Sequence, residues 1–209
     1  TSETDLTTFG VYGKWNTASD LYFAANAQYG FGDVEFKRSV TNGVDSEQSN
    51  AKSDLDKYGV YGEVGYSFIN NQWSVSPYAA LSFNSVTLDK VNESSEMGVT
   101  VDDVTAKETK LHAGVRFDYR VTENLALGGY GEYANAVDRS LPNVSLASNV
   151  DNTVGVNYQA PAYDKDYFLY GVTFNYLTSN SKWNVFGDVA GNANNSDDVQ
   201  VQVGLKYAF

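Results

Sequence analysis

The feature of the sequence that most constrains its fold is a two-residue alternation of apolar with polar or small side chains, sustained over long runs. In residues 199–209 every odd position is apolar or aromatic, and the even positions hold Gln, Gly, Lys or Ala. Because successive side chains of a β-strand point to opposite faces, such a run predicts a strand with one apolar face. The same pattern recurs in residues 21–31, 57–68, 110–121 and 168–176.

The length of these runs distinguishes a membrane barrel from a soluble sheet. A tilted strand needs roughly 9–11 residues to cross a bilayer, and the runs reach that length, whereas strands of soluble proteins average about 5–6 residues. The chain has 14% aromatic residues, 18 Gly and 3 Pro, which is typical of long strands with aromatic belts at the membrane interfaces. We therefore predict an all-β fold, a transmembrane antiparallel up-and-down β-barrel, in one domain over residues 1–209.

Short and long connections alternate between the predicted strands. The short ones lie near residues 16–20, 69–72, 122–124 and 178–181, and the long polar ones near 32–56, 89–109 and 137–164. Outer-membrane barrels have short periplasmic turns and longer external loops, so the C-terminus is predicted to be periplasmic. About nine strands result, over residues 6–16, 21–32, 56–69, 73–88, 107–121, 125–137, 164–178, 182–192 and 198–209.

An odd number of strands is unusual, because bacterial single-chain barrels have even numbers. Counting back from a periplasmic C-terminus places Thr1 on the external side. Either the count is short by one strand, or an odd number of strands precedes this sequence. Residues 33–40 are the place where a strand is most easily miscounted, because their apolar positions shift from odd to even. We interpret them as a strand that runs beyond the membrane with a bulge; a separate strand is the alternative.

The C-terminal residues form a recognisable motif. Its fixed positions are a polar residue, a glycine, a hydrophobic residue and two aromatic residues, the second at the end of the chain; they are Gln202, Gly204, Leu205, Tyr207 and Phe209. The motif resembles the signal that is read by the β-barrel assembly machinery.

Further matches are spread over the whole chain, which resembles the C-terminal part of an autotransporter translocator domain, the barrel of type V secretion. They lie in residues 9–13, 21–30, 58–68, 73–83, 110–119 and 187–209. Such barrels usually have twelve strands preceded by a pore helix, so the resemblance implies that about three strands and the helix are absent here. It also implies a protein of the outer membrane of Gram-negative bacteria that anchors an upstream passenger and helps to export it to the cell surface.

The partners that the resemblance implies are outer-membrane lipid and lipopolysaccharide, the β-barrel assembly machinery and the chain's own upstream passenger segment. The alternative function is a self-contained small outer-membrane barrel that acts as an adhesin, a porin or a structural protein. It requires an even strand count and a periplasmic N-terminus. The sequence does not identify the passenger. Nucleic acid is excluded as a partner, because the net charge is −12 and phosphate contacts need a basic surface.

Enzymatic chemistry has one candidate residue. His112, the single histidine, lies on the predicted interior face beside Lys110, Arg116 and Asp118. Barrel hydrolases pair histidine with a nearby serine, but no serine lies within several residues on this strand, although a spatial neighbour could supply one. We favour a structural histidine and predict that the chain is not an enzyme. With no Cys and one His, no metal or cofactor is expected.

Charged residues of both signs are predicted to line the interior. The candidates are Glu63, Arg116, Asp118, Arg120, Glu132 and Asp188. A hydrated interior held by ion pairs is the simplest interpretation, and the resemblance implies that the acidic members could assist cleavage of a passenger linker. Lys37 and Arg38 follow the membrane run of the second strand and could meet lipopolysaccharide phosphates; a solvated strand extension is the preferred interpretation.

Overall fold

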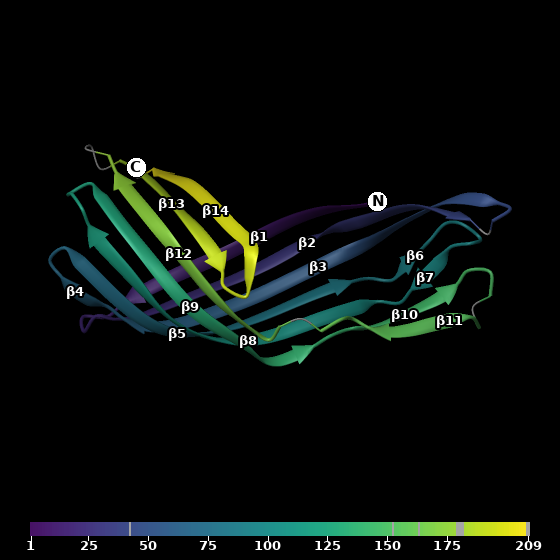
Figure 1. Ribbon diagram of the computed structural model, residues 1–209, viewed down its shortest axis with the longest axis horizontal. Coiled ribbons are helices and arrows are strands. Elements are labelled where there is room, and N and C mark those ends of the chain that lie inside the picture. The colour runs from purple at the N-terminus through teal and green to yellow at the C-terminus, as the bar shows by residue number, and fades with distance from the viewer. Residues whose placement is uncertain (42, 152, 163, 179–181, 208–209) are drawn as a thin grey trace.

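The protein forms a curved antiparallel sheet that is shaped like a trough (Figure 1). The computed structural model describes residues 1–41, 43–151, 153–162, 164–178 and 182–207. Within these residues all regular structure is β-strand. No helix among them is long and apolar enough to cross a membrane.

Nine long strands follow one another across the sheet in chain order. They are β1 (Ser2–Asn16), β2 (Leu21–Thr41), β3 (Ser46–Tyr66), β5 (Trp73–Leu88), β8 (Val104–Arg120), β9 (Leu125–Ser140), β12 (Asp166–Leu177), β13 (Trp183–Asn192) and β14 (Asn195–Tyr207). The short strand β4 (Phe68–Asn70) pairs with the start of β5. This arrangement confirms the predicted all-β, up-and-down membrane fold.

The sheet is a half-barrel. Each neighbouring pair is antiparallel, but β1 and β14 are not neighbours in the pairing of the described residues. The N-terminus lies on the side of the long strand extensions, short of their tip, and β14 ends toward the opposite side of the trough (Figure 1). Ser2 pairs with Phe36, which lies in the extension of β2. Thr1 therefore lies on the side of the long connections, as the strand count predicts.

The two faces of the sheet differ in chemistry. Tyr22 on β2 and Arg116 on β8 meet although two strands separate β2 from β8, so they lie on the concave face. The convex face carries the exposed apolar side chains, which form a band that lipid can solvate. Aromatic pairs lie at the end of the sheet that carries the short turns. The ring centres of Trp15 and Phe23 are 5.7 Å apart, and those of Trp183 and Tyr207 are 4.7 Å apart.

Glycines on the concave face make room for aromatic rings. A Cβ atom on Gly114 would lie 2.6 Å from the ring of Tyr78, and one on Gly171 would lie 2.7 Å from the ring of Tyr130. In each case the ring comes from an adjacent strand, since Tyr78 is paired with Gly114 and Tyr130 with Gly171. The glycines therefore allow large tyrosines to lie flat along the inner wall.

Strand β2 continues past the membrane band without the predicted bulge. Its pairing with β3 is unbroken from Leu21 with Tyr66 to Thr41 with Ser46. The shift of apolar residues from odd to even positions has another cause: beyond the membrane the outer face meets water, so Asp33 and Glu35 lie outward there and Val34 is buried inward. The prediction of one continuous strand is confirmed, and the bulge is wrong.

The long polar connections are more ordered than loops. Besides the extensions of β2 and β3 they contain a second sheet with the strand order β11-β10-β7-β6. Figure 1 shows it at the end of the trough beside these extensions. Its strands are β6 (Val91–Asn92), β7 (Val99–Val101), β10 (Asn143–Ser148) and β11 (Gly155–Gln159).

Candidate functional site

The inner wall of the half-barrel holds a connected set of polar side chains. At its centre Arg116 on β8 reaches Glu63 on β3 through two hydrogen bonds, Nη1 to Oε1 at 2.5 Å and Nη2 to Oε2 at 2.9 Å. The side chain of Glu63 is only 4% exposed. A buried carboxylate is stable only when it is paired and hydrogen-bonded, and this bidentate contact with arginine meets that need.

Tyrosines complete the surroundings of this ion pair. Arg116 also donates to the Tyr22 hydroxyl at 3.0 Å, and the Tyr61 hydroxyl donates to Glu63. The guanidinium lies 3.8 Å from the centre of the Tyr78 ring, in a cation–π contact. Four strands, β2, β3, β5 and β8, are thereby joined through side chains as well as through backbone pairing.

A second centre lies beside the first, around His112. Its Nδ1 is 2.8 Å from Oε1 of Glu132 on β9, and its Nε2 is 2.8 Å from Oγ of Ser82 on β5. The Tyr78 hydroxyl donates to the other oxygen of Glu132 at 2.6 Å. His112 and Ser82 are each 8% exposed. The histidine therefore has a serine on one ring nitrogen and a carboxylate on the other.

The sequence did not identify Ser82 as this neighbour, because the serine lies on a different strand from His112 and their contact depends on strand register. The register of β5 against β8 brings the two residues together. Ala80 is paired with His112 and Ser82 with Lys110, so Ser82 lies diagonally across from the imidazole. Tyr22, Tyr61 and Tyr78 were missed for a similar reason. Their even or odd positions were visible, but their hydroxyl partners depend on the register of several strands.

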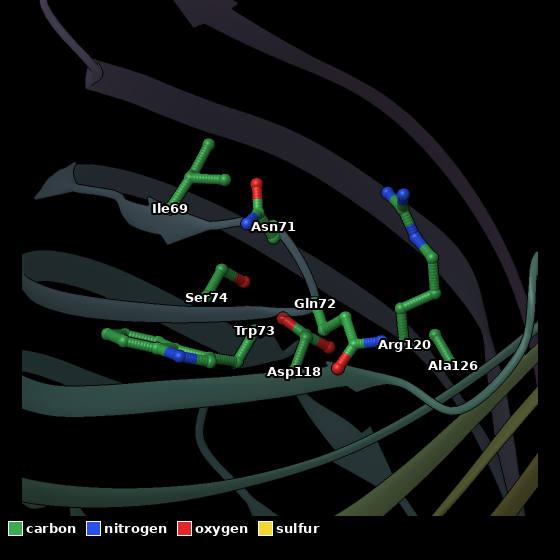
Figure 2. Close-up of a pocket in the computed structure, with 8 residues that line it drawn as sticks. All are labelled: Ile69, Asn71, Gln72, Trp73, Ser74, Asp118, Arg120 and Ala126. Atoms are coloured by element: carbon green, nitrogen blue, oxygen red, sulfur yellow. The ribbon is translucent and has the colours of Figure 1, made fainter.

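The remaining predicted interior charges line two hollows. One, of about 380 Å³, brings Asp118 and Asp188 together with Arg116 on the inner wall. The other, of about 220 Å³, lies beside the turn between β4 and β5 and contains Asp118 and Arg120. Figure 2 shows Asp118 beside Gln72 in this second hollow, with the Arg120 side chain directed away from both. Glu63, Arg116 and Glu132 thus form one connected group, and the other three lie outside it.

The residues of the C-terminal motif occupy alternating faces of β14. Leu205 and Tyr207 pair with Val185 and Trp183 and belong to the convex face. Gly204 faces inward, where the Phe186 ring occupies the space that a side chain would fill. Gln202 lines the larger inner hollow together with Asp188. Phe209 lies outside the described residues, and the reading of the motif by assembly machinery stays a prediction.

The basic residues beyond the membrane band already have acidic partners. Arg38 donates from Nε and Nη2 to both oxygens of Glu93, each at 2.6 Å. Lys37 lies 3.4 Å from Glu35. The Arg38 guanidinium is the main cause that lowers the pKa of the Glu93 carboxyl, and the pKa of Arg38 is raised in turn by Glu93. This part of the surface therefore offers lipopolysaccharide phosphates less free positive charge than the sequence suggested.

A metal centre has no support in the described part of the chain, where no group of three or more His, Asp or Glu side chains could hold an ion. The polar side chains of the concave face can form hydrogen bonds with a polar chain segment. At Ser82 this face also places a hydroxyl against an imidazole.

Comparisons with known proteins agree with this architecture. Residues 1–190 match the autotransporter beta-domain family. The translocator domain of the autotransporter NalP from Neisseria meningitidis has a similar structure, with a TM-score of 0.70 and 14% identity over 100% of this chain and 67% of that one. The chain thus spans about two-thirds of the NalP domain.

Two larger outer-membrane barrels share the fold. The toluene transporter TbuX from Ralstonia pickettii gives a TM-score of 0.56 at 11% identity, over 100% of this chain and 60% of that one. The ferric yersiniabactin uptake receptor FyuA from Yersinia pestis gives a TM-score of 0.51 at 12% identity, over 98% of this chain and 33% of that one. No curated protein sequence matches the chain. Membrane-length strands, an apolar convex face, a polar inner wall and the family match over residues 1–190 lead to one conclusion: the chain belongs to the autotransporter β-domain family and resides in the cell outer membrane.

Proposed function

We propose that this half-barrel anchors an upstream passenger segment of its own chain in the outer membrane and helps to export it to the cell surface. The observation that carries the proposal is the combination of family membership with an unclosed sheet. In the described residues the outermost strands β1 and β14 do not pair with each other. Unpaired backbone groups cost several kcal/mol each in lipid, so each edge needs a partner strand in the membrane.

Further strands of the same polypeptide are the simplest partners for these edges. The NalP translocator domain is about half as long again as the stretch that this chain matches, since the chain covers 67% of it. Strands added beside β1 would enlarge the trough into a closed barrel of the translocator kind, with twelve strands as the expected number. The connected polar wall around Arg116 and Glu63 would then face a water-filled interior through which a chain segment can pass.

Insertion by the β-barrel assembly machinery is the second part of the proposal. It is supported by the C-terminal motif on β14, in which Leu205 and Tyr207 lie on the lipid face and Gly204 lies on the inner face. Neither the export nor the anchoring requires bond breaking by the barrel, so this role needs no catalytic group.

The proposal is tested by following the barrel and the upstream segment in the same cells. The full-length protein is produced in a Gram-negative host, and intact cells are treated with an external protease. Tyr207→Ala should lower the amount of folded barrel and of surface-exposed upstream segment together. Lys206→Gln is the matched control, because Lys206 is the neighbouring position that the motif leaves free, and it should change neither quantity.

An inserted barrel without any surface-exposed upstream segment would contradict the proposal. The alternative of a self-contained small barrel would instead be supported by an intact native mass that corresponds to residues 1–209 alone. Its structural requirement is a closed ring, and the pairing of the described strands does not supply the contact between β1 and β14 that would close one.

A further inference from the structure

Three side chains on the inner wall have the arrangement of a nucleophile, a base and an orienting acid. Ser82 on β5, His112 on β8 and Glu132 on β9 come from three consecutive strands of the sheet. The distances are 2.8 Å from Ser82 Oγ to His112 Nε2 and 2.8 Å from His112 Nδ1 to Glu132 Oε1. A nucleophile bonded to a base that is itself oriented by a third group is the geometry that activates serine.

The direction of the hydrogen bonds follows from the groups around Glu132. An ionised carboxylate can only accept, and Glu132 accepts from the Tyr78 hydroxyl at 2.6 Å on one oxygen. The other oxygen therefore takes the Nδ1 proton of His112, which leaves the Nε2 lone pair free for the Ser82 hydroxyl. The imidazole is held in the tautomer that a general base needs.

The residue opposite the serine is a lysine whose ammonium group lies over the Tyr167 ring of β12, 5.0 Å from the ring centre. Lys110 is the residue directly opposite Ser82 in the pairing of β5 with β8, and directly opposite side chains in a sheet have Cβ atoms about 4.5–5.5 Å apart. Its ammonium group bonds to Glu108 at 2.7 Å and is partly exposed. Because β5 and β12 lie on opposite sides of β8, Glu108 and Tyr167 hold this ammonium group on the β12 side, and it is not a partner for the ester carbonyl.

We propose that Ser82 is a reactive serine that takes acyl groups from small, water-soluble carboxylic esters reaching the inner wall. The Ser82 oxygen attacks the ester carbonyl while its proton passes to His112 Nε2. The carbon–oxygen bond of the ester breaks, and the leaving alcohol takes that proton, which gives an acyl-serine. Water then attacks the acyl-serine, its proton passes through His112 to the Ser82 oxygen, and the carboxylic acid is released.

The class of substrate follows from the position of the three residues. They lie on the concave face with Arg116 and Tyr78, whereas lipid meets the convex face. Acyl chains of membrane lipids are therefore on the wrong side of the sheet, and the ester must arrive from water. This inference concerns an activity separate from passenger export, and either can fail without the other.

The test is covalent labelling of the folded, full-length protein in detergent micelles with a fluorophosphonate probe, followed by mass spectrometry of the labelled peptide. Wild type should be phosphonylated at Ser82, and Ser82→Ala should lose the label. His112→Gln should be labelled at least tenfold more slowly, since a positioned general base contributes about 10²–10⁴ in rate, and Glu132→Gln should also be slower. Ser76→Ala is the matched control, because Ser76 lies on the same strand and bonds to Ser67 at 3.1 Å.

Two results would overturn the proposal: labelling of Ser82 no faster than that of other serines, or labelling that is unchanged in His112→Gln. Folding of each variant is checked by the heat-dependent gel mobility of a barrel. If Ser82→Ala does not fold, Ser82→Cys provides the second readout, since its alkylation by iodoacetamide should depend on His112. Alkylation at the same rate with and without His112 would count equally against the proposal.

Discussion

Strand β2 contains two regions in which the apolar and polar faces are reversed. In residues 21–32 its outer face is apolar and its inner face carries Tyr22, which is buried in the polar network. In residues 33–41 the outer face carries Asp33 and Lys37, and the inner face buries Val34. The backbone pairing is the same throughout. The medium on the outer side, lipid or water, therefore decides which face of a continuous strand is apolar.

The two regions can also be compared through two bidentate arginine–glutamate ion pairs of similar burial. Arg116 and Glu63 form a bidentate pair within the membrane region, and Arg38 and Glu93 form one beyond it. The arginine side chains are 40% and 45% exposed, and the glutamate side chains 4% and 8%. Because the two pairs are buried to a similar extent, a difference in their contributions to stability would report on their surroundings.

A lysine on the outer face of β2 should be tolerated in one region and not in the other. Ala27→Lys places a charge among lipid tails and should cost about 2–4 kcal/mol of folding free energy near the bilayer midplane. Ser39→Lys, on the same face of the same strand beyond the band, should change the free energy by less than about 0.5 kcal/mol. Urea unfolding of protein in lipid vesicles measures both. Equal costs would mean that the band of lipid contact is placed wrongly.

Removing the arginine of each ion pair compares the two surroundings directly. Arg116→Met leaves Glu63 buried with tyrosine hydroxyls alone, and breaking a fully buried pair costs about 3–5 kcal/mol, which partial exposure of the arginine reduces to roughly 2. Arg38→Met should cost less, about 1 kcal/mol, because Glu93 keeps the hydrogen bond from the Val99 backbone N–H and this pair lies beyond the membrane band. Unfolding in vesicles provides the values. Adding Glu63→Gln to Arg116→Met should restore part of the loss, and no restoration would show that the carboxylate is not the cause.

A methyl group added to glycine should distinguish the two faces of the membrane region. A Cβ atom on Gly114 would meet the Tyr78 ring at 2.6 Å and the Gly131 carbonyl oxygen at 2.8 Å, whereas one on Gly62 would meet nothing within 4 Å. Gly114→Ala should therefore cost about 1–2 kcal/mol through overpacking. Gly62→Ala should be neutral or slightly stabilising. A destabilised Gly62→Ala with an unaffected Gly114→Ala would contradict the packing described for the inner wall.

The alternation in the sequence was sufficient to predict the nine strands of the membrane region, their order and the faces of their side chains, because a period of two is a local property. It was also sufficient to place Glu63, Arg116 and Glu132 on the inner wall. The contacts among them were not predictable, since the partner of Arg116 depends on the register of β3, β5 and β8 taken together. Ser82 was missed as a neighbour of His112 for this reason.

The second sheet, β11-β10-β7-β6, which we call the external sheet, was not predicted from the sequence. Two of its strands are very short, as β6 with only Val91 and Asn92 illustrates, and β7 of one connection pairs with β10 of another. Strands of two or three residues, such as β6 and β7, are too short for an alternation to be recognised, and β10 and β11, with six and five residues, are little longer. The bulge predicted for residues 33–40 is wrong because the sequence carries no marker for the point at which lipid gives way to water.

Acidification should loosen the external sheet while the membrane region stays folded. This is the smallest of the expected differences between the two regions. The pKa of Glu93 is lowered in the folded protein, chiefly by Arg38 and also by the Val99 backbone N–H. A carboxylate with a lowered folded-state pKa contributes stability that is fully present above its ordinary value of 4.5 and is lost as the pH falls through the folded value. Hydrogen exchange at the amides of β6 and β7 should therefore accelerate below about pH 4.5, relative to the intrinsic exchange rate at each pH.

The variant Glu93→Gln makes this prediction specific to one carboxyl group. It removes the titrating group but keeps an acceptor for Arg38 and Val99, so the exchange should be faster than in wild type at neutral pH and should change less on acidification. Amides of β5 and β8 at the membrane level serve as the internal reference, because lipid and strand pairing protect them at either pH. Equal acceleration in both regions would mean that acid loosens the whole half-barrel, and the two regions would then not be separate units of stability.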